Sequence, residues 1–154
     1  MTELTVLMDG IYFGEGPRWR DGYLWLSDFY AHEVLKVDPQ GNRSHVATVP
    51  EQPSGLGWLP DGRLLIVSML DRKLLCYDGT ELSEYADLSN LASFSCNDMV
   101  VDNAGLAYVG NFGFDLVNSA PRKMAEIILV QPNGDMRIVA DEVSFPNGTV
   151  ITPD

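Results

Sequence analysis

Short apolar runs separated by polar turn residues recur along the chain, and they predict β-strands rather than helices. No long amphipathic helical pattern is present. Each of three successive units contains a run that follows a Gly-containing turn, as the second strand of a hairpin would. These second strands are expected at 24–28, 64–68 and 106–111, third strands at 33–37, 73–77 and 126–130, and fourth strands at 44–49, 81–86 and 136–140. The pattern predicts an all-β fold with four antiparallel strands in each unit.

One polar position recurs four residues before an apolar residue that leads into a turn. It is occupied by Glu15, Ser54, Asn97 and Asn147, which precede Trp19, Trp58, Val101 and Ile151. The intervals between successive members of the second set are 39, 43 and 50 residues. Periods of this length, built from short strands, are typical of β-propeller blades.

The period divides the chain into blades at about 15–52, 53–92 and 93–144, with the start of a fourth blade at 145–154. Three blades do not close a ring, and open blade faces favour aggregation. The chain is therefore expected to be the N-terminal part of a longer protein, in which residues 4–8 supply a strand that closes the last blade. Otherwise the open faces need a partner, most simply a second copy of the chain.

The third unit is longer than the other two. Its second hairpin strand and its next turn are separated by ten extra residues, which fall within 112–123. This segment has the composition of a loop and contains two aromatic residues, Phe112 and Phe114.

Strand alternation places these features together. The first strand of each propeller blade lines the central channel, so the four recurring polar residues should ring one mouth of that channel. Second strands return to the same face, which puts Asp28, Ser68, Asn111 and the segment 112–123 beside the ring. The inserted segment is therefore expected to form a lid or wall over the mouth.

The predicted ring carries one carboxylate and two amide oxygens. Such hard ligands suit Ca²⁺, Mg²⁺ or Mn²⁺, and suit Zn²⁺ less well, because neither His32 nor His45 falls at the recurring position. In the alternative interpretation, polar residues at strand starts only satisfy backbone groups of the preceding turns.

The chain has 10 Lys and Arg against 22 Asp and Glu, a net charge of −12, which argues against nucleic-acid binding. No run reaches the roughly 18 apolar residues of a membrane span, and the first ten residues lack the basic region of a signal peptide. A cytoplasmic protein that does not bind membranes is expected.

Two kinds of residue are expected in the core. Trp19, Trp25 and Trp58 should fill the spaces between blades. Cys76 and Cys96 are interpreted as reduced core thiols, although a disulfide between them is conceivable.

Four segments together resemble the SMP-30/gluconolactonase (regucalcin-like) family: 15–19, 96–102, 108–115 and 146–148. The resemblance covers essentially the whole chain but only about the first half of the family fold. It implies a six-bladed propeller with one divalent cation in the central channel, and hydrolysis of sugar lactones. Ca²⁺ is the ion expected first here, with Zn²⁺, Mg²⁺ or Mn²⁺ as alternatives.

The resemblance also implies roles for individual residues. Glu15 and Asn147 would be metal ligands, and Asn97 would be a further ligand or a substrate contact; in the related propeller phosphotriesterases this Asn position binds calcium directly. The family's general base, an Asp, is expected beyond residue 154, so no catalytic residue is expected in this chain and the chain alone should be inactive. Some lactone-hydrolysing members carry an Arg where this sequence has Ser95, so their particular substrate is not carried over.

The resulting hypothesis is a divalent-metal-dependent lactonase in which water attacks a metal-polarised lactone carbonyl. Asn97, Asn111 and Phe114 would contact the small-molecule substrate. Two alternatives stay open: a phosphotriesterase that uses the same ion, and a non-catalytic propeller that serves as a binding scaffold.

Overall fold

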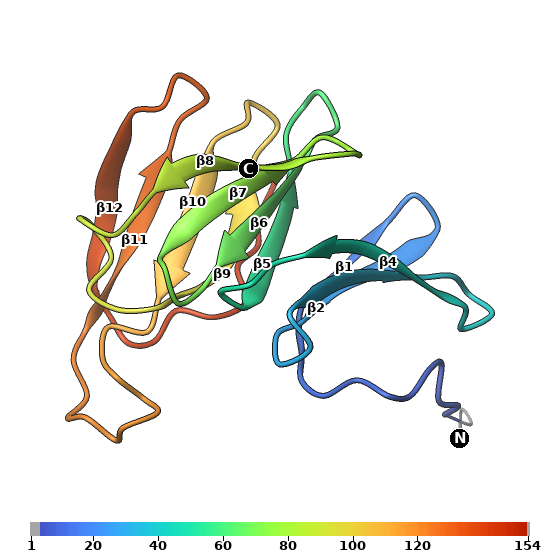
Figure 1. Cartoon of the computed structure of the whole chain (residues 1–154). Helices are drawn as coiled ribbons and strands as arrows, with labels where there is room; N and C mark the ends of the chain where they lie inside the picture. Colours follow the sequence, from blue (N-terminus) through green and yellow to red (C-terminus); the bar gives the residue numbers. More distant parts are fainter. Residues whose placement is uncertain (1–3, 154) are drawn as a thin grey trace.

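The computed structural model describes residues 4–153, and this part of the chain forms twelve strands in three four-stranded antiparallel sheets (Figure 1). The first sheet contains β1 (Gly14–Arg20), β2 (Tyr23–Asp28), β3 (Glu33–Val37) and β4 (Arg43–Thr48). The second contains β5 (Pro53–Trp58), β6 (Leu64–Ser68), β7 (Lys73–Tyr77) and β8 (Leu82–Asp87). The third contains β9 (Cys96–Val101), β10 (Ala107–Asn111), β11 (Ala125–Val130) and β12 (Met136–Val143). The all-β prediction with four antiparallel strands per unit is confirmed.

Each sheet keeps its strands in chain order, so every connection within a sheet is a hairpin. No helix long and apolar enough to cross a membrane occurs in residues 4–153. The segment that joins β10 to β11, residues 112–124, is the long loop predicted from the spacing and projects beyond the third sheet in Figure 1.

Aspartate side chains shape several turns at the ends of the strands. Asp38 accepts hydrogen bonds from the backbone of Gln40 and Asn42, and Asp102 accepts them from Ala104 and Leu106. In the turn between β7 and β8, hydrogen bonds from the backbone of Glu81 and from Thr80 lower the pKa of Asp78 to about 2. Part of the acidic composition is therefore used to stabilise turns.

Two apolar cores hold the three sheets together. Fully buried residues such as Leu65, Val67 and Leu74 of the second sheet pack with Met99 and Val109 of the third. A second cluster joins the first and second sheets: Val34, Ala47, Val49, Leu56, Leu64 and Ile66. The second sheet is thus covered on both faces.

The tryptophans follow the core prediction only in part. Trp25 and Trp58 pack edge to face against each other, with ring centroids 5.3 Å apart. Both rings pack against the core between the first two sheets. The prediction was wrong for Trp19, which is 64% exposed. Trp19 lies opposite Leu24 on the neighbouring strand, so the two side chains share one face of the first sheet. Leu24 packs with Met8 on that face, which is not the face that packs on the second sheet.

The three first strands, β1, β5 and β9, lie next to one another, with β5 in the middle. Glycine at Gly16 and Gly55 permits this close approach. A Cβ atom added to Gly16 would lie 2.8 Å from the carbonyl oxygen of Ser54, and one added to Gly55 would lie 2.5 Å from the backbone nitrogen of Met99. The backbones of the three strands therefore converge in the arrangement expected around a propeller axis.

The two ends of the described chain lie outside the sheets. Residues 4–8 and 145–153 form no strand in the structure. The closing strand at 4–8 and the fourth blade at 145–154 stay predictions, and Asp154 itself lies outside the described residues.

Candidate functional site

The recurring polar position falls at the same place on each inner strand. Glu15, Ser54 and Asn97 are the second residues of β1, β5 and β9. Glu15 is half-buried, whereas Ser54 and Asn97 are almost fully buried. Asn147 is exposed in the segment that follows β12. The convergence of the three strands brings the first three residues to one end of the inner layer.

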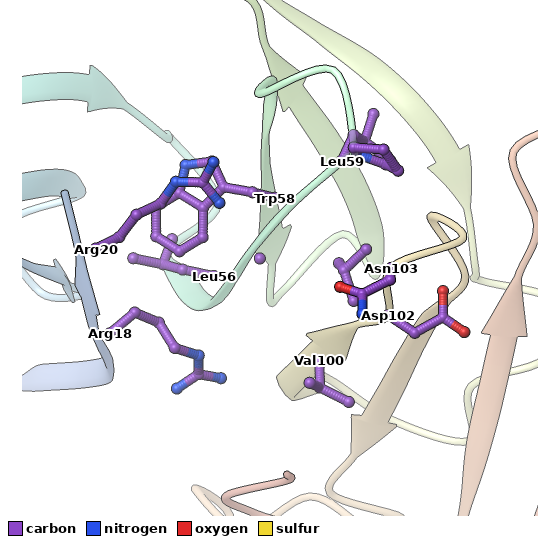
Figure 2. A pocket seen from close by; sticks show the side chains of 11 residues that line it. Arg18, Arg20, Leu56, Trp58, Leu59, Val100, Asp102 and Asn103 are labelled. Carbon is purple, nitrogen blue, oxygen red and sulfur yellow. The ribbon is translucent and has the colours of Figure 1, made fainter. Parts of the chain in front are cut away.

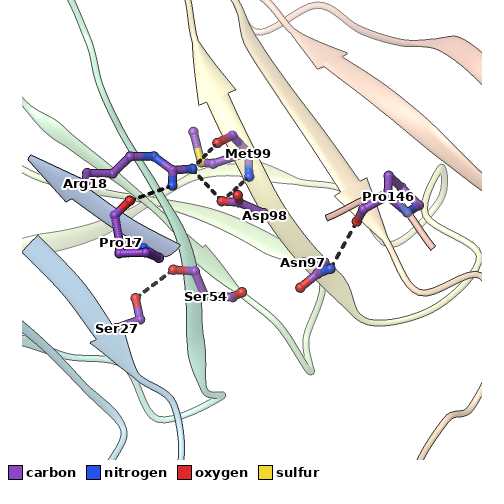
Figure 3. A network of polar contacts seen from close by, with 8 residues as sticks. All are labelled: Pro17, Arg18, Ser27, Ser54, Asn97, Asp98, Met99 and Pro146. Carbon is purple, nitrogen blue, oxygen red and sulfur yellow. Dashed lines mark hydrogen bonds and ion pairs between the residues drawn. The ribbon is translucent and has the colours of Figure 1, made fainter. Parts of the chain in front are cut away.

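Asn97 links this end to the segment that carries Asn147. Its side-chain Nδ2 donates a hydrogen bond of 3.0 Å to the carbonyl oxygen of Pro146 (Figure 3). Pro146 also packs on Gly110, where an added Cβ would lie 3.0 Å from the proline ring. With Nδ2 engaged, the amide oxygen of Asn97 is the atom left to receive a ligand.

Ser54 contributes a buried hydroxyl that has no hydrogen-bond partner among the described residues. The carbonyl oxygen of Ser54 is held by the Ser27 hydroxyl at 2.6 Å, so the backbone at this point is fixed. In Figure 3 the free hydroxyl of Ser54 faces the amide oxygen of Asn97. A buried polar group without a partner costs on the order of 1–3 kcal/mol, which a bound ligand would recover. The other such atom in residues 4–153 is Oδ1 of Asp71, in the loop after β6.

Glu15 has a raised pKa. Burial is the largest cause, the backbone amide of Gly16 opposes it, and the negative charge of Asp98 raises the pKa further. The charge of Asp98 therefore acts on a partly buried carboxylate, and a cation near Glu15 would offset both the burial and the repulsion.

Asp98 is held by an ion pair that the sequence did not reveal. Its Oδ1 accepts hydrogen bonds from the guanidinium of Arg18 at 2.6 Å and from the backbone nitrogen of Met99 at 2.8 Å (Figure 3). The same guanidinium donates to the carbonyl oxygen of Met99 at 2.7 Å. Arg18 thus ties β1 to β9, eighty residues apart in sequence, and neutralises one of the two carboxylates.

The available donors are a carboxylate, a hydroxyl and an amide oxygen, and they fit a hard cation. The nearby thiol of Cys96 is not a suitable ligand, because burial raises its pKa to about 12. Both cysteines are free and buried, as expected. Within residues 4–153 no three His, Cys, Asp or Glu side chains form a cluster that could hold a metal ion. A cation at this place would therefore depend on amide and hydroxyl oxygens as well as on Glu15.

Asn111, predicted to contact substrate, is fully buried and uses both ends of its amide within the protein. Nδ2 donates to the carbonyl and carboxylate oxygens of Glu126, and Oδ1 accepts from the backbone of Gly113. Burial opposes ionisation of Glu126, but hydrogen bonds from Ser93 and Asn111 outweigh it and lower the pKa. The structure therefore gives Asn111 a bracing role at the base of the 112–124 loop, and a direct substrate contact stays a prediction.

Phe114, the third predicted substrate contact, lies in an aromatic group beside Asn147. Phe112 and Phe145 stack with centroids 4.7 Å apart, and Phe114 lies 6.1 Å from Phe145. Because Phe145 is two residues from Asn147, the loop reaches the segment that carries the fourth polar position.

A cavity of about 460 Å³ lies at the opposite end of the inner strands (Figure 2). Its walls include Arg18, Arg20, Trp58 and Asp102. The guanidinium of Arg20 lies over the Trp58 ring at 4.8 Å and pairs with Asp21 at 3.2 Å. The charges in this cavity are already paired or used in turns, so it offers less to a ligand than the end that holds Ser54.

The SMP-30/gluconolactonase/LRE-like region family matches residues 13–154. A gluconolactonase of Zymomonas mobilis is 23% identical over 176 aligned positions, which cover 99% of this chain and 49% of the relative.

Solved structures show the same fold. A gluconolactonase from Xanthomonas campestris has a TM-score of 0.74 at 20% identity, covering 88% of this chain and 49% of the other. A calcium-binding regucalcin from Agrobacterium tumefaciens has a TM-score of 0.66 at 22% identity, covering 86% and 44%. The three sheets therefore match part of a propeller, and the chain spans about half the length of these relatives.

Proposed function

Because the chain belongs to the SMP-30/gluconolactonase/LRE-like family, we propose that it supplies one half of the ion-binding mouth of a divalent-cation-dependent hydrolase of sugar lactones. The observation that carries this proposal is the buried, unpartnered hydroxyl of Ser54, which lies at the same strand position as Glu15 and Asn97. Three inner strands each present a side-chain oxygen at this point, and that of Ser54 is buried without a partner in the described residues.

The residues of the chain would have separate roles at this mouth of the channel. Glu15, Asn97 and Asn147 would hold the ion, with Ser54 as a further oxygen donor. Arg18 keeps Asp98 neutralised, so that Glu15 is the carboxylate left for the ion. When bound, a divalent cation supplies Lewis-acid polarisation of the lactone carbonyl.

Other groups would act on the substrate and the water. Phe114 and the 112–124 loop would shape the pocket and exclude bulk water. The carboxylate that removes a proton from the attacking water is expected outside residues 1–154. The chain alone is therefore expected to bind a cation without turning over a lactone.

Ca²⁺ is the ion favoured by the donor chemistry, since it accepts several neutral oxygen ligands together with one carboxylate. The calcium-binding regucalcin of Agrobacterium tumefaciens, which shares the fold, agrees with this choice. Mg²⁺ and Mn²⁺ are the next candidates, and Zn²⁺ is less suited because the proposed ligands Glu15, Ser54, Asn97 and Asn147 include neither His nor Cys.

In the first test, the EDTA-treated chain is titrated with CaCl₂. Calorimetry measures the binding, and thermal unfolding measures the change in unfolding temperature. Saturable binding that raises the unfolding temperature is expected. It should disappear in Glu15→Gln and persist in Glu81→Gln, a matched change in the turn between β7 and β8. Equal binding by both variants would remove Glu15 from the site.

The second test is turnover of glucono-δ-lactone by the longest form of the protein, with and without EDTA. Loss of hydrolysis on chelation and recovery with a divalent cation are expected. Turnover of a phosphotriester but not of a lactone would favour the phosphotriesterase alternative. Cation-independent behaviour, with tolerance of Glu15→Gln and Asn147→Ala, would favour a binding scaffold.

A further inference from the structure

A separate cavity of about 510 Å³ lies under the 112–124 loop. Apolar side chains form most of its wall: Phe114, Leu116, Met124 and Phe145. Its volume falls within the range of small-molecule pockets, and its apolar character is typical of them. Arg122, Lys123 and Ser144 supply the polar part of the wall.

Two basic residues share the wall of this cavity in an acidic protein. Only 10 of 154 residues are Lys or Arg, and the net charge is −12, yet Arg122 and Lys123 are adjacent and line one apolar cavity. Neither makes an ion pair with a carboxylate in residues 4–153. Their positive charge is therefore available to a ligand.

The acidic residue of the same loop does not cancel this charge by contact. Both oxygens of Asp115 are occupied by Asn118, at 3.0 Å from its backbone nitrogen and 2.7 Å from its side chain. These hydrogen bonds from Asn118 lower the pKa of Asp115 and fix the turn. Asp115 is not among the residues that line the cavity.

The base of the loop is held by a glycine. Gly113 has φ of +75°, and a Cβ atom there would lie 2.8 Å from the carbonyl oxygens of both Lys123 and Met124. The beginning and the end of the loop are thus in contact. Asn111 and Glu126 brace the same point from below. The cations are therefore presented from a loop with a closed, supported base.

We propose that this cavity binds a small organic anion, namely a monocarboxylate with an aromatic or aliphatic body. The apolar body would pack against Phe114 and Met124, and the carboxylate would pair with Arg122 and Lys123. Because Phe145 belongs to both the cavity wall and the aromatic stack beside Asn147, the site adjoins the mouth. The proposal needs neither a bound cation nor hydrolysis, so its failure would leave the proposed function untouched.

The test compares 4-phenylbutyrate with its neutral amide, 4-phenylbutyramide, in buffer that contains EDTA. Affinities are measured by NMR titration. The carboxylate should bind about 10-fold more tightly than the amide, because charge-assisted hydrogen bonds are the stronger ones. The preference should fall as NaCl is raised.

Two matched double variants separate local charge from overall charge. Arg122→Gln with Lys123→Gln should abolish the preference for the carboxylate, whereas Arg43→Gln with Arg137→Gln changes the net charge equally and should keep it. Met124→Ala, at a half-exposed wall position, should weaken both ligands by a similar factor. Equal binding of acid and amide, an equal loss in both double variants, or no binding of either compound would overturn the proposal.

Discussion

The two ends of the same three inner strands differ in how their polar groups are satisfied. At the end that opens on the 460 Å³ cavity, Arg18 and Arg20 are paired, and Asp102 is used in a turn. At the other end the hydroxyl of Ser54 is buried without a partner, and the pKa of Glu15 is raised by burial and by a neighbouring carboxylate.

This difference in hydrogen bonding and pairing distinguishes polar groups that stabilise the fold from polar groups that are free to bind a ligand. Cavity size alone does not make this distinction, because the cavity in Figure 2 lies at the satisfied end. An unsatisfied buried donor or acceptor costs free energy in the isolated chain, and such a cost is typical of functional sites. The two ends should therefore respond to substitution in opposite ways.

The largest expected effect comes from the paired end. Arg18→Met should lower the free energy of unfolding by about 3 kcal/mol, since it leaves the buried carboxylate of Asp98 without its partner. Cation affinity should not fall, because the freed Asp98 adds negative charge near Glu15. Urea unfolding and calorimetry measure the two quantities.

A double-mutant cycle tests the cause of that loss. Adding Asp98→Asn to Arg18→Met removes the unpaired charge and should recover part of the stability. A double variant no more stable than Arg18→Met would show that the guanidinium acts through its packing or through Met99 rather than through Asp98.

Glu15→Gln should act in the opposite sense. Cation affinity should fall by at least about 100-fold, or roughly 3 kcal/mol, because even groups outside the ligand shell are worth 10- to 100-fold. Without cation the variant should be more stable than the wild type at neutral pH, since it lacks a charge that burial disfavours.

The pH dependence gives an independent check. The folded-state pKa of Glu15 lies above its ordinary value of 4.5, so the folded chain holds this proton more tightly than the unfolded chain. In EDTA, stability should decline as pH rises through this region in the wild type and less so in Glu15→Gln. With Ca²⁺ present, the added stability should appear above the raised pKa and be lost as pH falls through it. Identical pH profiles for both proteins would contradict this account.

Gly55 and Gly57 on β5 lie toward the two different ends of the inner strands, so substituting each one tests how closely the backbones approach there. A Cβ at Gly55 would meet the Met99 backbone nitrogen at 2.5 Å, whereas one at Gly57 would meet side-chain atoms of Val101 and Met99 at 2.5 and 3.0 Å. Backbone cannot move aside as readily as side-chain ends, so Gly55→Ala should cost about 2 kcal/mol more than Gly57→Ala. Equal losses in chemical unfolding would show that the strands can separate locally.

Much of the fold was readable from the sequence. The hairpin turns and apolar runs fixed the second and third strands to within one residue, because each strand is bounded by turn signals. Trp19 was misjudged because alternation tells which residues share a face but not which face has a neighbouring sheet.

The shared strand position of three candidate ligands was predictable, but their contacts were not. The repeat located Glu15, Ser54 and Asn97 at equivalent strand positions, since periodicity survives in the sequence. The pairing of Arg18 with Asp98 was not predictable, because it joins residues eighty positions apart through the close approach of two blades. The internal use of Asn111 was missed for a similar reason: its partner Glu126 lies across the inserted loop.

The smallest expected effect is the one that most directly compares a satisfied with an unsatisfied group. Ser27 and Ser54 are both buried serines, but the Ser27 hydroxyl donates to the Ser54 carbonyl at 2.6 Å while the Ser54 hydroxyl has no partner in the described residues. In EDTA, Ser27→Ala should lose about 1 kcal/mol of stability, and Ser54→Ala should be neutral or gain up to about 1 kcal/mol. Ser54→Ala should also weaken Ca²⁺ binding several-fold. If Ser54→Ala loses as much stability as Ser27→Ala and leaves Ca²⁺ affinity unchanged, the hydroxyl serves the fold, and the difference between the two ends no longer marks a site.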